Sequence, residues 1–155
     1  MAKTNVVRLL EAGKIPHQTF EYEVNEDELD AVTVADKIDA EHEQVFKTLI
    51  AKNEKNENFV FCIPGNYELD LKKAAKASGN KKIEMIKVKE ILQLTGYIRG
   101  GCSPVGMKKL FPTFIDETAQ LFDKIYVSAG VRGVQVKLSP LDLKEIINAE
   151  FADLI

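Results

Sequence analysis

Apolar residues recur with helical spacing in five segments of the chain. The first stripe of valines and leucines stops at Gly13, a residue that often ends helices. Asp70 and Ser139 are suitable N-caps, and Gly79 suits a helix C-terminus. These signals predict helices over residues 4–12, 30–39, 70–78 and 88–94, and a last helix that begins after Ser139.

Strand-like patterns occur between the predicted helices. Phe20, Tyr22 and Val24 alternate with glutamates, and two apolar runs flank a polar stretch that would form a long hairpin turn. We therefore predict strands over residues 20–24, 45–51, 59–63, 124–128 and 133–138. The irregular mixture, without repeated βαβ units, favours an α+β fold with a central mixed sheet flanked by helices.

Composition places the chain among soluble globular proteins. Its 155 residues are 45% hydrophobic, and no Pro-, Ser- or Gly-rich linker divides them, so residues 1–155 are expected to form a single domain. The chain has no apolar run of membrane-spanning length and no signal-peptide pattern at its start. The two cysteines lack the spacing of zinc ligands. We expect a cytoplasmic protein without a membrane partner or a structural metal.

Charge is distributed unevenly, although the net charge is only −3. Ten acids and one lysine lie between Glu21 and Glu43, whereas seven lysines and one acid lie between Lys72 and Lys89. The lysines can form a basic face that meets a phosphate backbone. Two ordinary solvated faces of opposite sign would give the same pattern.

Two features could carry chemistry. Adjacent glycines, Gly100 and Gly101, allow a ligand to approach backbone N–H groups, which can bind an anion or stabilise an oxyanion. Lys47 lies within an apolar strand, where a lysine can serve as an anion clamp. Each feature alone has an ordinary alternative, because paired glycines are common in turns and many lysines face solvent. Cys102 has no histidine near it in sequence, so we do not expect it to be a catalytic nucleophile.

Several motifs agree in order along the chain. They are Phe-Lys-Thr-Leu at residues 46–49, Leu-Asp-Leu-Lys-Lys at 69–73, Gly-Tyr-Ile-Arg-Gly-Gly-Cys-Ser-Pro-Val-Gly at 96–106, Ile-Tyr-Val-Ser-Ala-Gly at 125–130 and Arg-Gly at 132–133. Together they resemble the YbaK/EbsC family of aminoacyl-tRNA deacylases, which is related to the editing domain inserted in many bacterial prolyl-tRNA synthetases. The resemblance runs from about Val6 to Ile155.

This resemblance implies a partly barrel-like sheet and a trans-editing deacylase that removes cysteine from tRNA(Pro). It implies catalytic roles for Lys47, Gly100 and Gly101, and substrate binding by residues Tyr22, Thr48, Ser103, Ser128 and Gly130. The basic segment would bind tRNA through residues Lys72, Lys73, Lys76, Lys81 and Lys82. No cofactor is implied, and prolyl-tRNA synthetase is a candidate partner.

In the implied mechanism the substrate's own thiol attacks its ester and leaves as a thiolactone. The chain departs from the family at Asp30, where a relative carries an aromatic residue, and at Gln135, where some relatives carry an acid, so we assign Gln135 no acid/base role. Two alternatives are an alanyl-tRNA(Pro) deacylase with the same fold and a non-catalytic module that binds tRNA or a synthetase.

Overall fold

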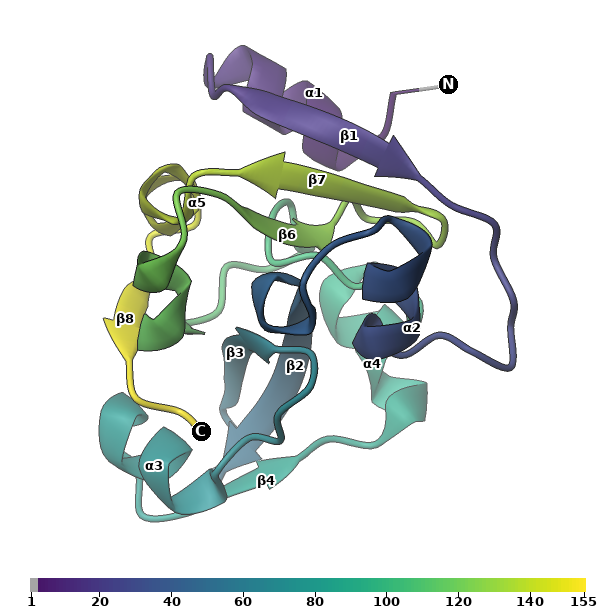
Figure 1. Ribbon diagram of the computed structural model, residues 1–155. Helices are drawn as coiled ribbons and strands as arrows, with labels where there is room; N and C mark the ends of the chain where they lie inside the picture. The colour runs from purple at the N-terminus through teal and green to yellow at the C-terminus, as the bar shows by residue number, and fades with distance from the viewer. Residues whose placement is uncertain (1–2) are drawn as a thin grey trace.

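The computed structural model describes residues 3–155 and contains two β-sheets with helices around them (Figure 1). The larger sheet has the strand order β4-β2-β3-β5-β8. Strands β2 and β3 form an antiparallel hairpin, β4 extends it on one side, and β5 and β8 add in parallel on the other. Their bounds are β2 Phe46–Asn53, β3 Asn58–Pro64, β4 Ile83–Met85, β5 Thr113–Asp116 and β8 Glu150–Ala152.

The smaller sheet is antiparallel and has the order β1-β7-β6. It comprises β1 (His17–Glu21), β6 (Ile125–Ser128) and β7 (Val134–Leu138). A single parallel bridge between Val45, just before β2, and Tyr126 on β6 joins the two sheets. The predicted α+β fold with a mixed sheet is therefore confirmed, but the strands divide into two bridged sheets instead of one.

Strand β3 separates two apolar layers, because its side chains alternate between the two faces of the sheet. Val60 and Cys62 pack into the main core with α1 (Asn5–Ala12) and α5 (Pro140–Ile146), whereas Phe61 and Ile63 pack against α3 (Leu71–Ser78). The main core thus fills the space between the two sheets, and α3 covers the opposite face of the larger one.

Helices α2 (Ala31–Lys37) and α4 (Val88–Thr95) lie on the same side of the molecule, next to β2 (Figure 1). Short 3-10 helices, η1 (His42–Gln44) and η2 (Glu117–Leu121), lead into β2 and β6. No helix among residues 3–155 is long and apolar enough to cross a membrane.

The helix caps predicted from sequence are present. The Asp70 carboxylate accepts hydrogen bonds from the Lys72 and Lys73 amides, and Gly79 ends α3 with a left-handed φ of 70°. Ser139 accepts hydrogen bonds at the start of α5, where Pro140 occupies the first turn. Local sequence signals were sufficient to predict these helix ends, because each end is stabilised by its own neighbouring residues.

The first strand was predicted too far along the chain, at residues 20–24. It ends at Glu21, and residues 22–25 form a loop. The reason is its partner: β7 begins at Val134, directly after Gly133, whose φ of 92° belongs to a turn. Tyr22 N–H still donates to Gly133 O at 2.9 Å, after which no strand remains to pair with.

Candidate active site

A cavity of about 450 Å³ opens between α2, β2, α4 and the edge of the smaller sheet. Its walls are mainly apolar, and six of its residues are buried: Val34, Val45, Phe46, Ile50, Ser128 and Gln135. Its polar groups include Asp30, Lys47, Thr48, Arg99, Ser128 and Gln135. A mainly apolar cavity of this size with a few polar groups is typical of a small-molecule site.

Lys47 is the half-buried cation of this cavity. It lies on β2 opposite Ile63, and its Nζ donates a long hydrogen bond of 3.4 Å to Gly65 O. Burial lowers the pKa of the Lys47 ammonium, and attraction to Glu68 and Asp30 opposes that effect. Because the ammonium has three donors, it can still bind an anionic or carbonyl oxygen of a ligand.

Gly65, directly after β3, brings the chain close to α2, and the sequence analysis did not single it out as a site residue. A Cβ at this position would lie 2.3 Å from Ala31 Cβ, so only glycine fits without movement. Its N–H donates to Val45 O at 2.8 Å, while its carbonyl accepts from Lys47. The signal that could have found it is the Pro-Gly-Asn break directly after a predicted strand.

Asp30 caps α2 at the rim of the cavity. Its carboxylate accepts hydrogen bonds from the Thr33 amide at 2.9 Å and from the Thr33 hydroxyl. The hydrogen bond from the Thr33 amide is the main cause that lowers the pKa of Asp30. The carboxylate therefore adds negative charge at the rim, opposite in sign to Lys47.

Of the two adjacent glycines, Gly100 lines the cavity with a φ of 83°. Gly101 lies behind it, and its N–H donates to Ile98 O at 2.9 Å within a turn. The loop is held by Arg132, whose Nε donates to Arg99 O at 2.8 Å. A Cβ on Gly101 would lie 3.1 Å from the Arg132 backbone nitrogen, so the loop packs tightly on the following turn.

The other residues proposed to bind substrate lie at different depths. Thr48 and Ser128 line the cavity, and Ser128 Oγ accepts from the Gly130 N–H at 3.1 Å. Ser103 is fully buried behind the wall, where its Oγ accepts from the Val105 N–H. Gly130 packs against the Tyr97 ring and so supports Ser128 from behind.

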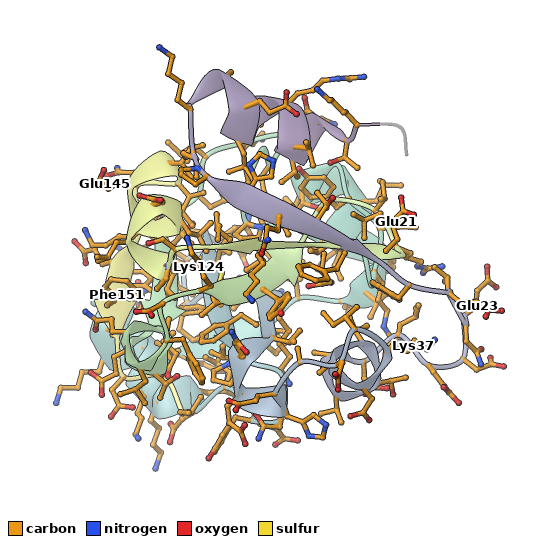
Figure 2. All side chains as sticks on the ribbon, turned by 45° about the horizontal axis from the view of Figure 1, so that its top comes forward. Glu21, Glu23, Lys37, Lys124, Glu145 and Phe151 are labelled. Atoms are coloured by element: carbon orange, nitrogen blue, oxygen red, sulfur yellow. The ribbon has the colours of Figure 1, made fainter. Side chains whose placement is uncertain are left out.

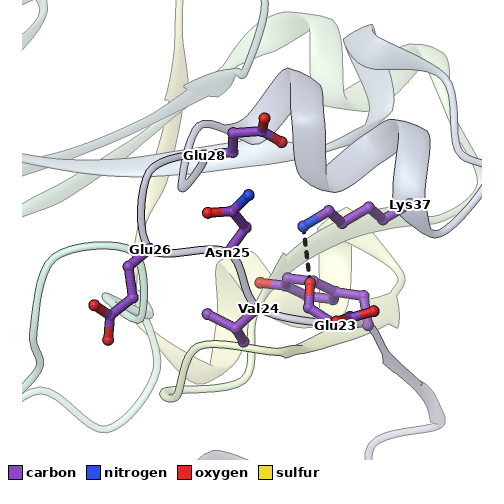
Figure 3. A pocket seen from close by; sticks show the side chains of 7 residues that line it. Glu23, Val24, Asn25, Glu26, Glu28 and Lys37 are labelled. Atoms are coloured by element: carbon purple, nitrogen blue, oxygen red, sulfur yellow. Dashed lines mark hydrogen bonds between the residues drawn. The ribbon is translucent and has the colours of Figure 1, made fainter.

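Tyr22 lies in a separate open hollow of about 740 Å³ (Figure 3). This hollow is lined by the loop after β1 and by Lys37 of α2, whose Nζ donates to Glu23 O at 2.8 Å. Figure 2 shows Glu21, Glu23 and Lys37 on one side of the molecule, away from Lys124, Glu145 and Phe151. The structure does not bring Tyr22 together with Lys47 in one cavity.

Cys102 also lines the cavity, but its thiol is poorly suited to attack an ester. Burial raises the pKa of Cys102 to about 11, with a smaller opposing effect of a hydrogen bond to Thr95. The thiol is therefore protonated at neutral pH, and the thiolate is the nucleophilic form. Among residues 3–155, no three His, Cys, Asp or Glu side chains are grouped as metal ligands.

The predicted tRNA-binding lysines lie on α3 and in the segment after it. Lys72, Lys76, Lys81 and Lys82 are exposed, whereas Lys73 Nζ donates to Asp153 at 3.2 Å and also to Ile155 O. None of them lines the cavity. The same segment continues into β4 and α4, where Met85, Ile86 and Val88 form part of the cavity wall. Lys87 and Lys89 flank Val88 and are exposed, so these two cations lie nearest the cavity along this segment.

The sequence and the fold of the chain match those of aminoacyl-tRNA editing proteins. The model of the aminoacyl-tRNA editing domain family matches residues 25–146, and the chain belongs to this family. Its class is therefore that of an aminoacyl-tRNA deacylase, a hydrolase-type enzyme.

Individual relatives support this assignment. The chain is 49% identical to EbsC of Enterococcus faecalis, which carries the provisional name of Cys-tRNA(Pro)/Cys-tRNA(Cys) deacylase, over 98% of this chain and 93% of that protein. It is 26% identical to a solved structure described provisionally as a trans-editing enzyme for prolyl-tRNA synthetase, with a TM-score of 0.81 over 99% and 98% of the two chains. Part of the chain, 46%, is also 32% identical to 12% of a proline–tRNA ligase of Brachyspira hyodysenteriae. The resemblance to the YbaK/EbsC family is thereby confirmed.

Proposed function

We propose that this protein removes cysteine from mischarged tRNA(Pro). The observation that carries the proposal is the cavity that Lys47 and Gly100 both line, together with Cys102, whose thiol is protonated. Such a site can hold an ester and stabilise charge, but it offers no activated side-chain nucleophile. A substrate that carries its own nucleophile fits this arrangement, and the name of the EbsC relative points to cysteine.

In the proposed reaction, the thiol sulfur of the substrate attacks the ester carbonyl carbon. The bond between that carbon and the ribose oxygen breaks, and the proton lost by the thiol ends on the ribose oxygen. The products are a cyclic thiolactone and tRNA with a free terminal hydroxyl. Holding sulfur and carbonyl in attack geometry supplies much of the rate enhancement in such intramolecular steps.

Lys47 and Gly100 have distinct roles in this proposal. The Lys47 ammonium binds an oxygen of the acylated terminus through a charge-assisted hydrogen bond. Gly100 offers its N–H to the developing oxyanion, while the Gly101 N–H stays in its turn with Ile98. Thr48 and Ser128 complete the wall around the aminoacyl group. The route requires no metal and no organic cofactor.

The acceptor stem of the tRNA binds, in this proposal, along the basic segment from Lys72 to Lys89. Phosphate contacts of this kind give affinity with little sequence discrimination. A partner that selects the tRNA would therefore be useful, and we propose prolyl-tRNA synthetase, as the partial match to a proline–tRNA ligase suggests. The substrate would be met in the cytoplasm, where tRNAs are charged.

The decisive experiment compares cysteinyl-, alanyl- and prolyl-tRNA(Pro) as substrates. We expect rapid loss of cysteine only, and a Lys47→Ala variant whose kcat/KM is lower by roughly 10²- to 10³-fold, as for loss of one oxyanion-stabilising donor. Lys52→Ala is the matched control, because Lys52 lies on the same strand, outside the cavity, with its Nζ 3.8 Å from Glu84.

Other outcomes would change the assignment. Loss of alanine instead of cysteine would keep the enzyme class and overturn the thiol-assisted mechanism. Binding of tRNA without turnover of any substrate would indicate a non-catalytic module. Equal losses of activity in the Lys47 and Lys52 variants would show that Lys47 has no specific role in the reaction.

A further inference from the structure

Gln135 carries an unpaired polar atom in the interior. Among residues 3–155, its Oε1 is the one buried side-chain nitrogen or oxygen that has no hydrogen-bond partner. The residue is 5% exposed. Buried polar groups are nearly always paired, because leaving one unpaired costs stability. An unpaired amide that persists in a core therefore calls for an explanation.

The position of Gln135 on β7 directs its side chain away from the main core. Its neighbours along the strand, Val134 and Val136, belong to that core, so Gln135 faces the opposite side of the sheet. The residues directly across from it are Ser128 on β6 and Phe20 on β1. Ser128 and Gln135 both line the cavity that contains Lys47.

The amide of Gln135 can reorient toward the cavity. Its oxygen is shielded from water in the free protein, and no hydrogen bond holds that oxygen in place. The terminal torsion of glutamine is broad and roughly two-fold, so the amide can turn and exchange its oxygen and nitrogen at little cost. A donor on a bound ligand would fix the turned amide and satisfy its oxygen.

We infer that Gln135 binds the α-ammonium group of the aminoacyl substrate through its amide oxygen. This inference rests on the proposed function. The α-ammonium is one carbon from the ester carbonyl, so a carbonyl held by Lys47 and Gly100 places it inside the same cavity. An ammonium is a strong donor whose hydrogen bonds are charge-assisted, whereas a thiol is a weak donor. Gln135 offers a neutral acceptor in the cavity that Lys47 also lines.

The inference predicts opposite effects of one substitution on stability and on activity. Gln135→Met keeps the length of the side chain and removes its polar atoms. Without substrate, the variant should unfold at the same temperature as the wild type or at a higher one, because an unpaired buried oxygen is lost. With cysteinyl-tRNA(Pro), its kcat/KM should fall by about 10- to 100-fold, as expected for a hydrogen bond to a charged group.

The test pairs two substrates that differ only in the α-ammonium: cysteinyl-tRNA(Pro) and 3-mercaptopropionyl-tRNA(Pro). We expect Gln135→Met to lose activity on the first and to match the wild type within about 2-fold on the second, since only the first has the charged donor. Gln135→Glu, which keeps an acceptor, should retain its preference for the cysteinyl ester and provides the readout if the methionine variant does not fold. An equal loss on both substrates, or no loss on either, would overturn the inference. Failure of the wild type on cysteinyl-tRNA(Pro) would instead contradict the proposed function.

Discussion

Two hollows of the molecule, one around Tyr22 and one around Lys47, differ in the way that separates a reaction site from a surface depression. The hollow around Tyr22 is larger, about 740 Å³ against about 450 Å³, but Glu23, Glu26, Glu28 and Lys37 at its walls are exposed. Several residues in the walls of the cavity around Lys47 are buried, and burial lowers the pKa of Lys47. Exclusion of water, more than volume, strengthens the interaction of a charge with a ligand.

The difference arises from how each hollow is built. The open hollow is formed by one exposed loop and by Lys37, the last residue of the seven-residue helix α2. The cavity is formed where α2, two sheets, α4 and the glycine loop meet, so its shape depends on tertiary packing. Changes that alter this packing should therefore affect the cavity strongly and the open hollow weakly.

The largest effect is expected from Gly65→Ala. The new Cβ would meet Ala31 Cβ at 2.3 Å, which forces α2 away from β3 and moves the carbonyl that Lys47 binds. Overpacking of this kind costs about 1–3 kcal/mol, which urea unfolding measures. We also expect kcat/KM for deacylation of cysteinyl-tRNA(Pro) to fall at least about 10-fold. A displacement of about 1 Å in a group that positions the substrate can reduce the rate by more than this factor.

Tyr22→Ala is the control in the open hollow, and its kcat/KM should stay within about 2-fold of the wild type, since surface changes have small effects. A large loss in the tyrosine variant would mean that the two hollows act together on the substrate. Unchanged activity in Gly65→Ala would show that the placement of α2 is unimportant for the reaction.

The dependence of activity on pH should reflect Lys47 in the cavity and should be insensitive to the lysine of the open hollow. Because burial lowers the pKa of Lys47, the unfolded chain binds more protons than the folded protein at alkaline pH just below the ordinary lysine pKa. The contribution of Lys47 to the free energy of unfolding therefore rises with pH across that window. Activity that needs the ammonium should fall across the same window.

The measurement is kcat/KM against pH, after subtraction of spontaneous ester hydrolysis. Lys47→Arg should be slower but should lack this alkaline decline, because arginine stays charged. Lys37→Met, in the open hollow, should keep the wild-type profile. An alkaline decline that persists in Lys47→Arg would assign it to another group.

Sequence patterns predicted the local parts of this fold well and the non-local parts poorly. Helix caps such as Asp70 and Ser139 depend on neighbouring residues, and the β2–β3 hairpin joins two adjacent apolar runs. The strands that were missed are three or four residues long and cover residues 83–85, 113–116 and 150–152. Two of them pair in parallel with distant segments, and such pairing leaves no local alternation to detect.

The candidate site shows the same division. Lys47, Thr48, Gly100 and Ser128 do meet in the cavity, which the ordered motifs led us to expect. Gly101, Ser103 and Gly130 instead support the wall from behind, where each takes part in a turn. The motifs could not show this, because the conformation of a turn decides which of its groups face the cavity. The sequence marked Gln135 only as a departure from the family, since only the packed sheet shows that its oxygen lacks a partner.

The smallest effects are expected from substitutions in the basic segment from Lys72 to Lys89. Substitutions of glutamates in the open hollow around Tyr22, called the acidic hollow below, serve as the comparison. Lys87 and Lys89 flank a residue of the cavity wall, whereas Lys72 and Lys76 lie farther back on α3. We expect Lys87→Ala/Lys89→Ala to raise KM about 2- to 5-fold, because exposed charge contacts contribute at most about 1 kcal/mol. The salt dependence of binding should also weaken, by roughly 0.7–0.9 in log–log slope for each phosphate that the variant no longer neutralises.

Lys72→Ala/Lys76→Ala should have the smaller effect if the acceptor stem runs from the cavity along α4 before it reaches α3. Binding of tRNA(Pro) measured between low and moderate salt gives both slopes. Glu26→Gln/Glu28→Gln in the acidic hollow removes negative charge and should leave the slope unchanged, because those residues line the other hollow and lie outside the proposed path. If the acidic variant changes the slope and the lysine variants do not, the tRNA approaches from the side of Tyr22, and the roles of the two hollows in docking are reversed.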